Sequence, residues 1–108
     1  MEPLLFVLSQ APQKPLALEA IDAVMTAVLF DQDPCVLFIG AGIEQLEQPA
    51  FKEKFIQLTE LGLNKVYASQ LAPNNTEQNY LDSGLSITSL SDTETASLLH
   101  TANKILSF

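Results

Sequence analysis

Short apolar runs, uninterrupted by polar residues, alternate along this chain with longer stretches of mixed character. Two of these runs are unambiguous, at residues 4–8 (LLFVL) and 35–39 (CVLFI). Runs of this length are typical of strands that are covered on both faces, as in parallel sheets. Weaker strand patterns occupy 64–69, 85–90 and 104–108. This alternation restricts the fold more than any other feature of the sequence.

The stretches between the runs carry helical signals. The first helix is predicted over about residues 14–30, because apolar side chains recur there at helical spacing. Its stripe is Ile21, Val24, Met25, Val28 and Leu29. A second helix is predicted to begin near Pro49, since proline is tolerated in a first turn. Its stripe is Phe51, Phe55, Leu58 and either Leu61 or Gly62, and Gly62 is also suited to cap the end of the helix.

The second half of the chain is less regular. Residues 91–94 (SDTE) form a capping-box pattern, which predicts a helix running to about Asn103. Residues 73–75 (PNN) predict a turn, with a weak helix following towards Leu81. Residues 43–48 are open to interpretation as a short helical turn.

The order of elements is therefore strand and helix in alternation, beginning and ending with a strand. It predicts a single α/β domain over residues 1–108, with a mostly parallel five-stranded sheet and helices on both faces. In such sheets ligands bind at the carboxyl ends of the strands. Three loops would lie there: 9–13, 40–44 and 69–75.

Composition excludes several classes of function. The chain has 13 acidic residues, five lysines and no arginine, for a net charge of −8. Direct binding of nucleic acid by the chain alone is excluded, because such binding depends on cations that neutralise phosphates. No apolar run reaches the roughly 18 residues of a membrane span, and a single cysteine fits a reducing compartment. We expect a cytoplasmic protein without membrane contact. Its 47% apolar content favours burial of surface against partners.

Cys35 and His100 are the only cysteine and the only histidine. Cys35 opens a strand, so it would lie at the amino edge of the sheet, and Asp31 and Asp33 precede it. A reactive thiolate needs a positive, accessible environment, and we therefore predict a structural, partly buried thiol. His100 lies late in the last helix without a nearby partner, and we predict a surface position. One cysteine and one histidine make a zinc site improbable.

Residues 40–42 (GAG) could be mistaken for a phosphate-binding turn. A dinucleotide fingerprint needs three glycines after the first strand, whereas this pair follows the second strand and no P-loop lysine is present. We interpret it as a tight turn. Several acid pairs have no obvious partner and are interpreted as solvated surface: Asp31/Asp33, Glu44/Glu47 and Glu53/Glu60. No catalytic, cofactor-binding or metal-ligating residue is identified, and no cofactor is expected.

Five segments together resemble the DsrE/DsrF-like sulfur-relay family, and within it the TusC (DsrF) type of subunit. The resemblance covers nearly the whole chain. It rests on residues 5–12 (LFVLSQAP), 18–27 (LEAIDAVMTA), 36–46 (VLFIGAGIEQL), 55–63 (FIQLTELGL) and 104–108 (KILSF).

The resemblance implies a heterohexamer with two copies each of TusB-like, TusC-like and TusD-like subunits. That assembly passes persulfide sulfur towards 2-thiolation of the tRNA wobble uridine, or, in related bacteria, serves sulfur oxidation. The sulfur-carrying cysteine of the family follows the third strand of the TusD-like subunit. Here residues 66–71 (VYASQL) contain none, so no catalytic residue carries over. A non-catalytic subunit of a sulfurtransferase complex is expected.

Three alternatives remain open from the sequence. Cys35 could itself accept sulfur, the chain could be a small-ligand-binding α/β module, or it could form a homo-oligomer when isolated.

Overall fold

The computed structural model describes residues 4–69, 86–102 and 104–108. The elements in chain order are β1 (Leu4–Leu8), α1 (Pro15–Leu29), β2 (Pro34–Phe38), the 3-10 helix η1 (Gly40–Glu47), α2 (Pro49–Leu61), β3 (Lys65–Ser69), β4 (Thr88–Leu90), α4 (Asp92–Thr101) and β5 (Lys104–Ser107). The turn and weak helix predicted between residues 71 and 82 lie outside the described residues.

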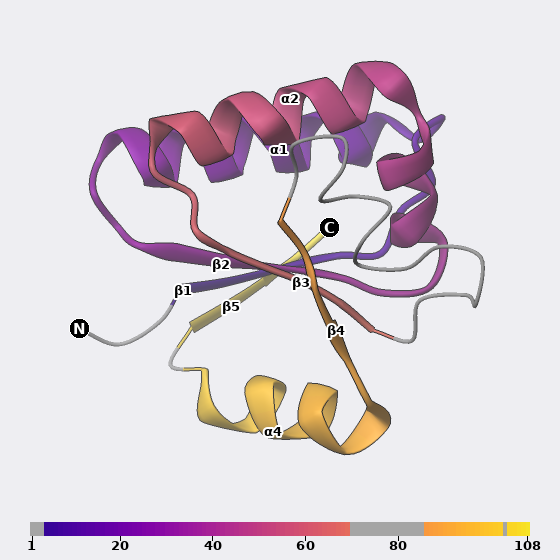
Figure 1. The fold of residues 1–108 in the computed structure, drawn as a ribbon, viewed down its shortest axis with the longest axis vertical. Helices are drawn as coiled ribbons and strands as arrows, with labels where there is room; N and C mark the ends of the chain where they lie inside the picture. Colours follow the sequence, from indigo (N-terminus) through magenta and orange to yellow (C-terminus); the bar gives the residue numbers. More distant parts are fainter. Residues whose placement is uncertain (1–3, 70–85, 103) are drawn as a thin grey trace.

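The five strands form one sheet in the order β4-β3-β2-β1-β5, and all four pairings are parallel. α1 and α2 lie on one face of this sheet, and α4 lies on the other (Figure 1). The predicted fold class is therefore confirmed: a five-stranded parallel sheet with helices on both faces. Because every strand points the same way, all the carboxyl ends meet at one edge.

The face covered by α1 and α2 holds the larger hydrophobic core. Side chains from β1, β2 and β3 pack there against both helices, and Phe38 meets Phe55 of α2 edge to face with ring centroids 5.0 Å apart. The opposite core is smaller and lies under α4. It consists of Leu5, Val7, Cys35, Leu37 and Leu90, with partly buried neighbours from α4.

The predicted stripe of α1 is correct except at its end. Ile21, Val24 and Val28 are buried, whereas Leu29 is 63% exposed. At 3.6 residues per turn, Leu29 lies about 140° around the helix from Val24, the centre of the buried face. Leu29 was therefore assigned to the wrong face.

The end of α2 was also only partly predicted. Gly62 caps the helix with φ of +130°, as expected from its sequence position. Leu61, the alternative stripe residue, is 54% exposed. The chain reverses at Gly62, Leu63 N–H donates to the Leu58 carbonyl at 2.9 Å, and Leu63 becomes the buried residue instead. This bond is typical of glycine-terminated helices.

Candidate functional site

The loops that follow β1 and β2 come together at the carboxyl edge of the sheet, as predicted. Ile39 N–H donates to the Leu8 carbonyl at 3.1 Å, which joins the two chain segments where their strands end. Gly42 lies directly against the same carbonyl, because a Cβ built on it would be only 1.9 Å from the Leu8 oxygen. η1 therefore lies over the end of β1, in a position that only glycine permits.

The sequence predicted an isolated tight turn at Gly40 and Gly42, and the structure does not have one there. These residues open the eight-residue 3-10 helix η1, which includes the uncertain segment 43–48 up to Glu47. Gly40 has φ of +51°, a conformation that favours glycine. The two glycines thus serve backbone geometry, one for the reversal after β2 and the other for the close approach to β1.

Gln45 is a buried polar residue that the sequence analysis did not single out. Its side chain is 0% exposed, and its Nε2 donates to the Gln10 carbonyl at 2.7 Å. This bond ties η1 to the loop after β1. The Gln45 Oε1 is buried and has no hydrogen-bond partner among the described residues. Nothing in the surrounding sequence, residues 43–48 (IEQLEQ), distinguishes Gln45 from the exposed Gln48, so burial alone reveals it.

Hydroxyl groups occupy the ends of the neighbouring strands. Ser9, after β1, donates from both its backbone N–H (2.8 Å) and its Oγ (3.0 Å) to the Phe108 carbonyl. Ser69, at the end of β3, accepts a hydrogen bond from Thr95 Oγ1 of α4 at 3.1 Å. Ser69 is the described part of the third predicted loop, and residues 70–75 lie outside the described residues.

The first turn of α4 also lies at this edge and carries its own acid. Ser91 Oγ accepts from Glu94 N–H at 3.2 Å, and Ser91 N–H donates to Glu94 Oε1 at 3.0 Å. These bonds complete the predicted capping box and lower the pKa of the Glu94 carboxyl further below neutral pH. The helix start is therefore occupied by a carboxylate and does not favour an anionic ligand.

The chain's only cysteine lies at the opposite edge. Cys35 is 3% exposed and packs under α4, so the thiol is buried, and more fully than the partly buried position predicted. Burial raises the pKa of the Cys35 thiol, and the negative charge of Asp33 adds to this, while the positive charge of Lys65 opposes it. A raised pKa disfavours the thiolate, which is the nucleophilic form.

Lys65 is the residue of this edge that sequence reasoning missed. Its Nζ lies 3.1 Å from Asp33 Oδ2, so Asp33 does have a partner, contrary to the interpretation of the acid pairs. The hydrogen bond to Asp33 raises the pKa of Lys65. The two residues are 32 positions apart. Only the pairing of β2 with β3 brings them together, so no local pattern in the sequence predicts this ion pair.

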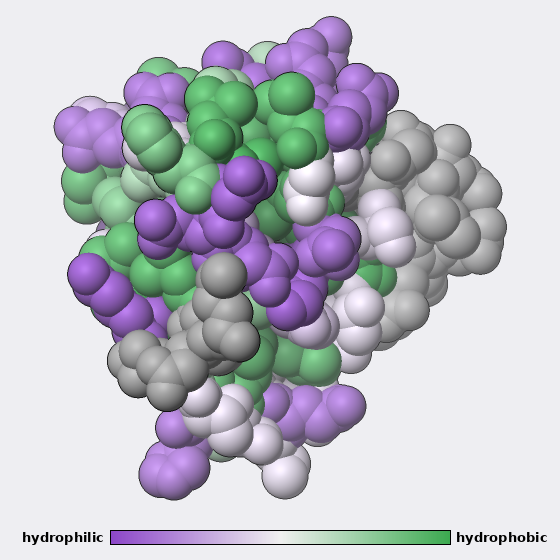
Figure 2. Space-filling view, turned by 90° about the vertical axis from the view of Figure 1, so that its left-hand side faces the viewer, coloured by the Kyte–Doolittle hydropathy of each residue, from purple (hydrophilic) through white to green (hydrophobic). Residues whose placement is uncertain are grey.

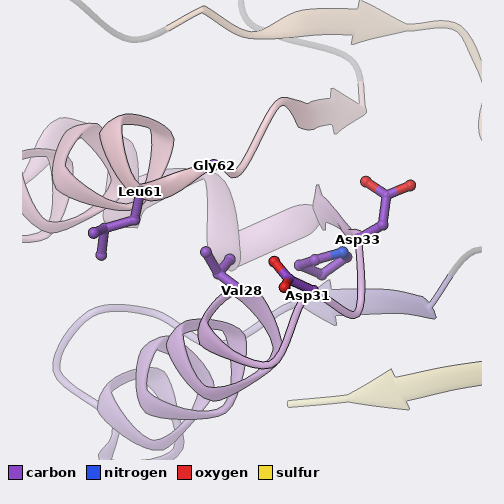
Figure 3. A pocket seen from close by; sticks show the side chains of 6 residues that line it. Val28, Asp31, Asp33, Leu61 and Gly62 are labelled. Carbon is purple, nitrogen blue, oxygen red and sulfur yellow. The ribbon is translucent and has the colours of Figure 1, made fainter.

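A small hollow of about 150 Å³ lies at the amino edge, between the ends of α1 and α2 (Figure 3). Asp31 lies beside Val28 there, whereas the Asp33 carboxylate points away from the helix ends. Asp31 and Asp33 have φ of 56° and 49°, left-handed conformations that aspartate tolerates better than most residues. Figure 2 views this side of the molecule and shows hydrophobic surface interspersed with hydrophilic side chains over the helical layer.

Other predicted features lie away from both edges or carry no chemistry. His100 is exposed on α4, as predicted. Over residues 4–69, 86–102 and 104–108, no three His, Cys, Asp or Glu side chains cluster in a way that could hold a metal ion. In the same part of the chain, no helix combines the length and apolar character needed to cross a membrane.

Comparison with known proteins supports the fold and does not resolve a family. No family model matches the sequence, and no curated protein matches it. Among solved structures, the crystal structure of the YchN protein from E. coli matches with a TM-score of 0.69 and 13% identity, covering 100% of each chain. Identity this low shows the fold alone. YchN is a protein of the DsrE/DsrF-like fold, and the described residues of this chain therefore share that fold.

Proposed function

We propose that this chain is a non-catalytic, TusC-like subunit of a sulfur-relay complex, which supports persulfide transfer towards 2-thiolation of the tRNA wobble uridine. The observation that carries the proposal is the position of its only thiol. Within a DsrE/DsrF-like fold, Cys35 is buried at the amino edge, while the exposed residues of η1 at the carboxyl edge, Ala41 and Glu44 among them, carry no thiol. Sulfur transfer needs an accessible thiolate, so a partner subunit must supply it.

The role proposed for the carboxyl edge is to shape the site that holds the partner's persulfide. η1 is held against the end of β1 by the close approach of Gly42 and by the Gln45 hydrogen bond, so two contacts position this surface on the sheet. Its outward residues, among them Ala41 and Glu44, are exposed and available for contact. Partners of this kind are expected to be TusB-like and TusD-like chains in a cytoplasmic heterohexamer.

Native mass measurement tests the assembly. The tagged chain, expressed with TusB-like and TusD-like chains and purified under mild conditions, is expected to elute as a heterohexamer. A chain that stays separate when both partners are present would contradict the proposal.

A pair of matched variants tests the site. Ala41→Arg places a bulky cation on the carboxyl edge, and Asn64→Arg places the same group at an exposed position at the amino edge, directly before β3. Sulfane sulfur supplied by a desulfurase should label the partner cysteine at least about tenfold more slowly with Ala41→Arg, a barrier increase of about 1.4 kcal/mol. Asn64→Arg should leave the rate unchanged. Equal rates for both variants would remove the carboxyl edge from the mechanism.

The same assay tests Cys35 as a sulfur acceptor. Labelling of this chain should be absent in the native protein and in Cys35→Ser alike, because the thiol is buried. Labelling that disappears only in Cys35→Ser would show that this chain is itself a sulfur carrier.

A further inference from the structure

β5 is an edge strand of the sheet. It pairs with β1 on one side, and no described residue pairs with its other side. Along a strand in a parallel sheet, the N–H and C=O groups of one residue point to one neighbour and those of the next residue point to the other. Phe108, just beyond β5, donates to the Val7 carbonyl at 2.9 Å and accepts from Ser9 N–H at 2.8 Å, so its groups face β1.

The direction of the remaining groups follows from that alternation. Leu106 and Lys104, at even positions like Phe108, direct their backbone groups towards β1. Ile105 and Ser107 direct theirs outward, away from the sheet. The open edge therefore presents two N–H donors and two C=O acceptors in register for a further strand.

Apolar surface flanks this row of groups on both sides. On the α1 side lies a groove of about 340 Å³, and no residue that lines it is charged. The lining residues are Leu4, Phe6, Ala23, Thr26, Ala27, Phe30, Gln32 and Leu106. Phe30 is 72% exposed at the rim of the groove. On the α4 side, Ile105 is 42% exposed. In a chain of net charge −8, an uncharged groove beside an open strand is a surface suited to association.

We infer that the β5 edge pairs with the β5 edge of a second copy of this chain, antiparallel and about a two-fold axis at Leu106. In this register Ile105 of each copy faces Ser107 of the other. Such a pair of residues exchanges both N–H···O bonds, so four bonds form and every outward group of both edges is satisfied. The two sheets become one continuous sheet of ten strands.

The occupant is a second copy because the edge is self-complementary. A two-fold interface requires one patch to match itself. The edge meets this requirement, because an axis at Leu106 pairs the outward groups of Ile105 in each copy with those of Ser107 in the other. The axis also brings Leu106 opposite its counterpart, so the two grooves, each lined by Leu106, join into one apolar surface. Lys104 is the one charged residue of β5, and in this register it is separated from its counterpart. The inference rests on this edge and does not depend on the sulfur relay.

Sedimentation of the pure chain over a range of concentrations, at about 0.15 M salt to screen its net charge, tests the inference. We expect a monomer–dimer equilibrium. Ser107→Pro removes an outward N–H and leaves the bonds to β1 in place, and proline is tolerated at such edge positions. It should raise the dimer dissociation constant at least about tenfold, since two bonds of the interface are lost. Ser107→Ala retains the N–H and should dimerise like the native chain.

Cysteine cross-linking tests the register. Residues opposite each other in a non-hydrogen-bonded antiparallel pair have Cα atoms about 4.5 Å apart, within the range of a disulfide. Leu106→Cys should therefore form a covalent dimer under mild oxidation, and Lys104→Cys should not. A native chain that stays monomeric, or that associates only with other proteins, would overturn the inference. A dimer that is insensitive to Ser107→Pro, or that cross-links equally at both positions, would also overturn it.

Discussion

The two edges of the sheet differ in what holds them and in what chemistry they offer. At the carboxyl edge, η1 is held against the end of β1 by the backbone approach of Gly42 and by the buried Gln45 amide, and the polar side chains nearby are the Ser9 and Ser69 hydroxyls and the Glu94 carboxylate. At the amino edge, the loop between α1 and β2 passes through two left-handed aspartates to a buried thiol. One half-exposed ion pair, Lys65 with Asp33, spans this edge.

The difference is that the only thiol lies at one edge of the sheet, and the surface proposed to face a partner lies at the other. The amino edge has the only thiol, and burial there favours its neutral form. The carboxyl edge has no thiol, and η1 is anchored there to the end of β1. Under the proposed function, such a chain shapes a site without performing the chemical step, and each prediction below changes one side of that comparison.

The largest effect is expected from Gly42→Ala. The added Cβ would lie 1.9 Å from the Leu8 carbonyl oxygen, so η1 must move away from β1. The contact is with backbone, which cannot rotate away as a side chain would. We expect a loss of unfolding free energy of about 3 kcal/mol or more, measured by urea denaturation.

Gly40→Ala is the matched control. A Cβ there meets nothing within 4 Å, although φ is +51°. The cost should be only the strain of the left-handed conformation, about 1 kcal/mol. Equal losses for the two variants would mean that the close approach of η1 to β1 does not contribute to stability.

Gln45→Glu should have the next largest effect, and one that depends on pH. The glutamate would place an ionisable oxygen against the Gln10 carbonyl in a fully buried position. Burial and the facing acceptor would raise the pKa of this carboxyl, because only the protonated form can donate. Its stability should match the native protein below pH about 4 and fall as pH rises, by about 2 kcal/mol at pH 7.

Gln45→Met separates charge from hydrogen bonding. It removes the Nε2 bond but also removes the unpartnered Oε1, and the two effects oppose each other. Stability should change by no more than about 1 kcal/mol, with no added pH dependence. If Gln45→Glu were as pH-independent as Gln45→Met, the Oε1 environment would be open to water.

The fold could be predicted from the sequence to a large extent because its signals are local. Continuous apolar runs predicted β1 and β2, the spacing of Ile21 and Val24 predicted α1, and the capping-box pattern predicted α4. Errors arose where a pattern reached the end of a helix, at Leu29 and Leu61, because the direction of the chain after the helix decides which residue is buried there. β4 is also shorter than the pattern suggested, beginning at Thr88.

The sequence predicted where the candidate site lies in the fold, but not which residues make contact there. The parallel order placed the loops after β1 and β2 at one edge, which the structure confirms. The bond from Gln45 to Gln10 spans 35 residues and the Lys65–Asp33 pair spans 32. Such contacts depend on the strand register, which sequence periodicity does not determine when both faces of the strands are apolar.

The smallest effect concerns the thiol of the amino edge. Because burial raises the pKa of Cys35 in the folded protein, the folded state retains a proton that the unfolded state releases above its ordinary pKa of about 8.5. The stabilisation is present below that pH and is lost as pH rises towards the folded pKa. Between pH 8.5 and 9.5 the unfolding free energy should therefore fall as pH rises.

Cys35→Ala should show no such decline over the same interval, since its side chain does not titrate. The interval from pH 8.5 to 9.5 lies below the range in which Lys65 titrates, because the hydrogen bond to Asp33 raises the pKa of Lys65 above its usual value of 10.5. The contribution of Lys65 to the unfolding free energy is therefore lost only at higher pH. Ellman's reagent, which reports accessible thiolate, should react with the native protein only at the rate of unfolding. Rapid reaction at pH 8, or identical pH profiles for Cys35→Ala and the native chain, would mean that the thiol is exposed. The amino edge would then offer chemistry of its own, and the contrast between the two edges would fail.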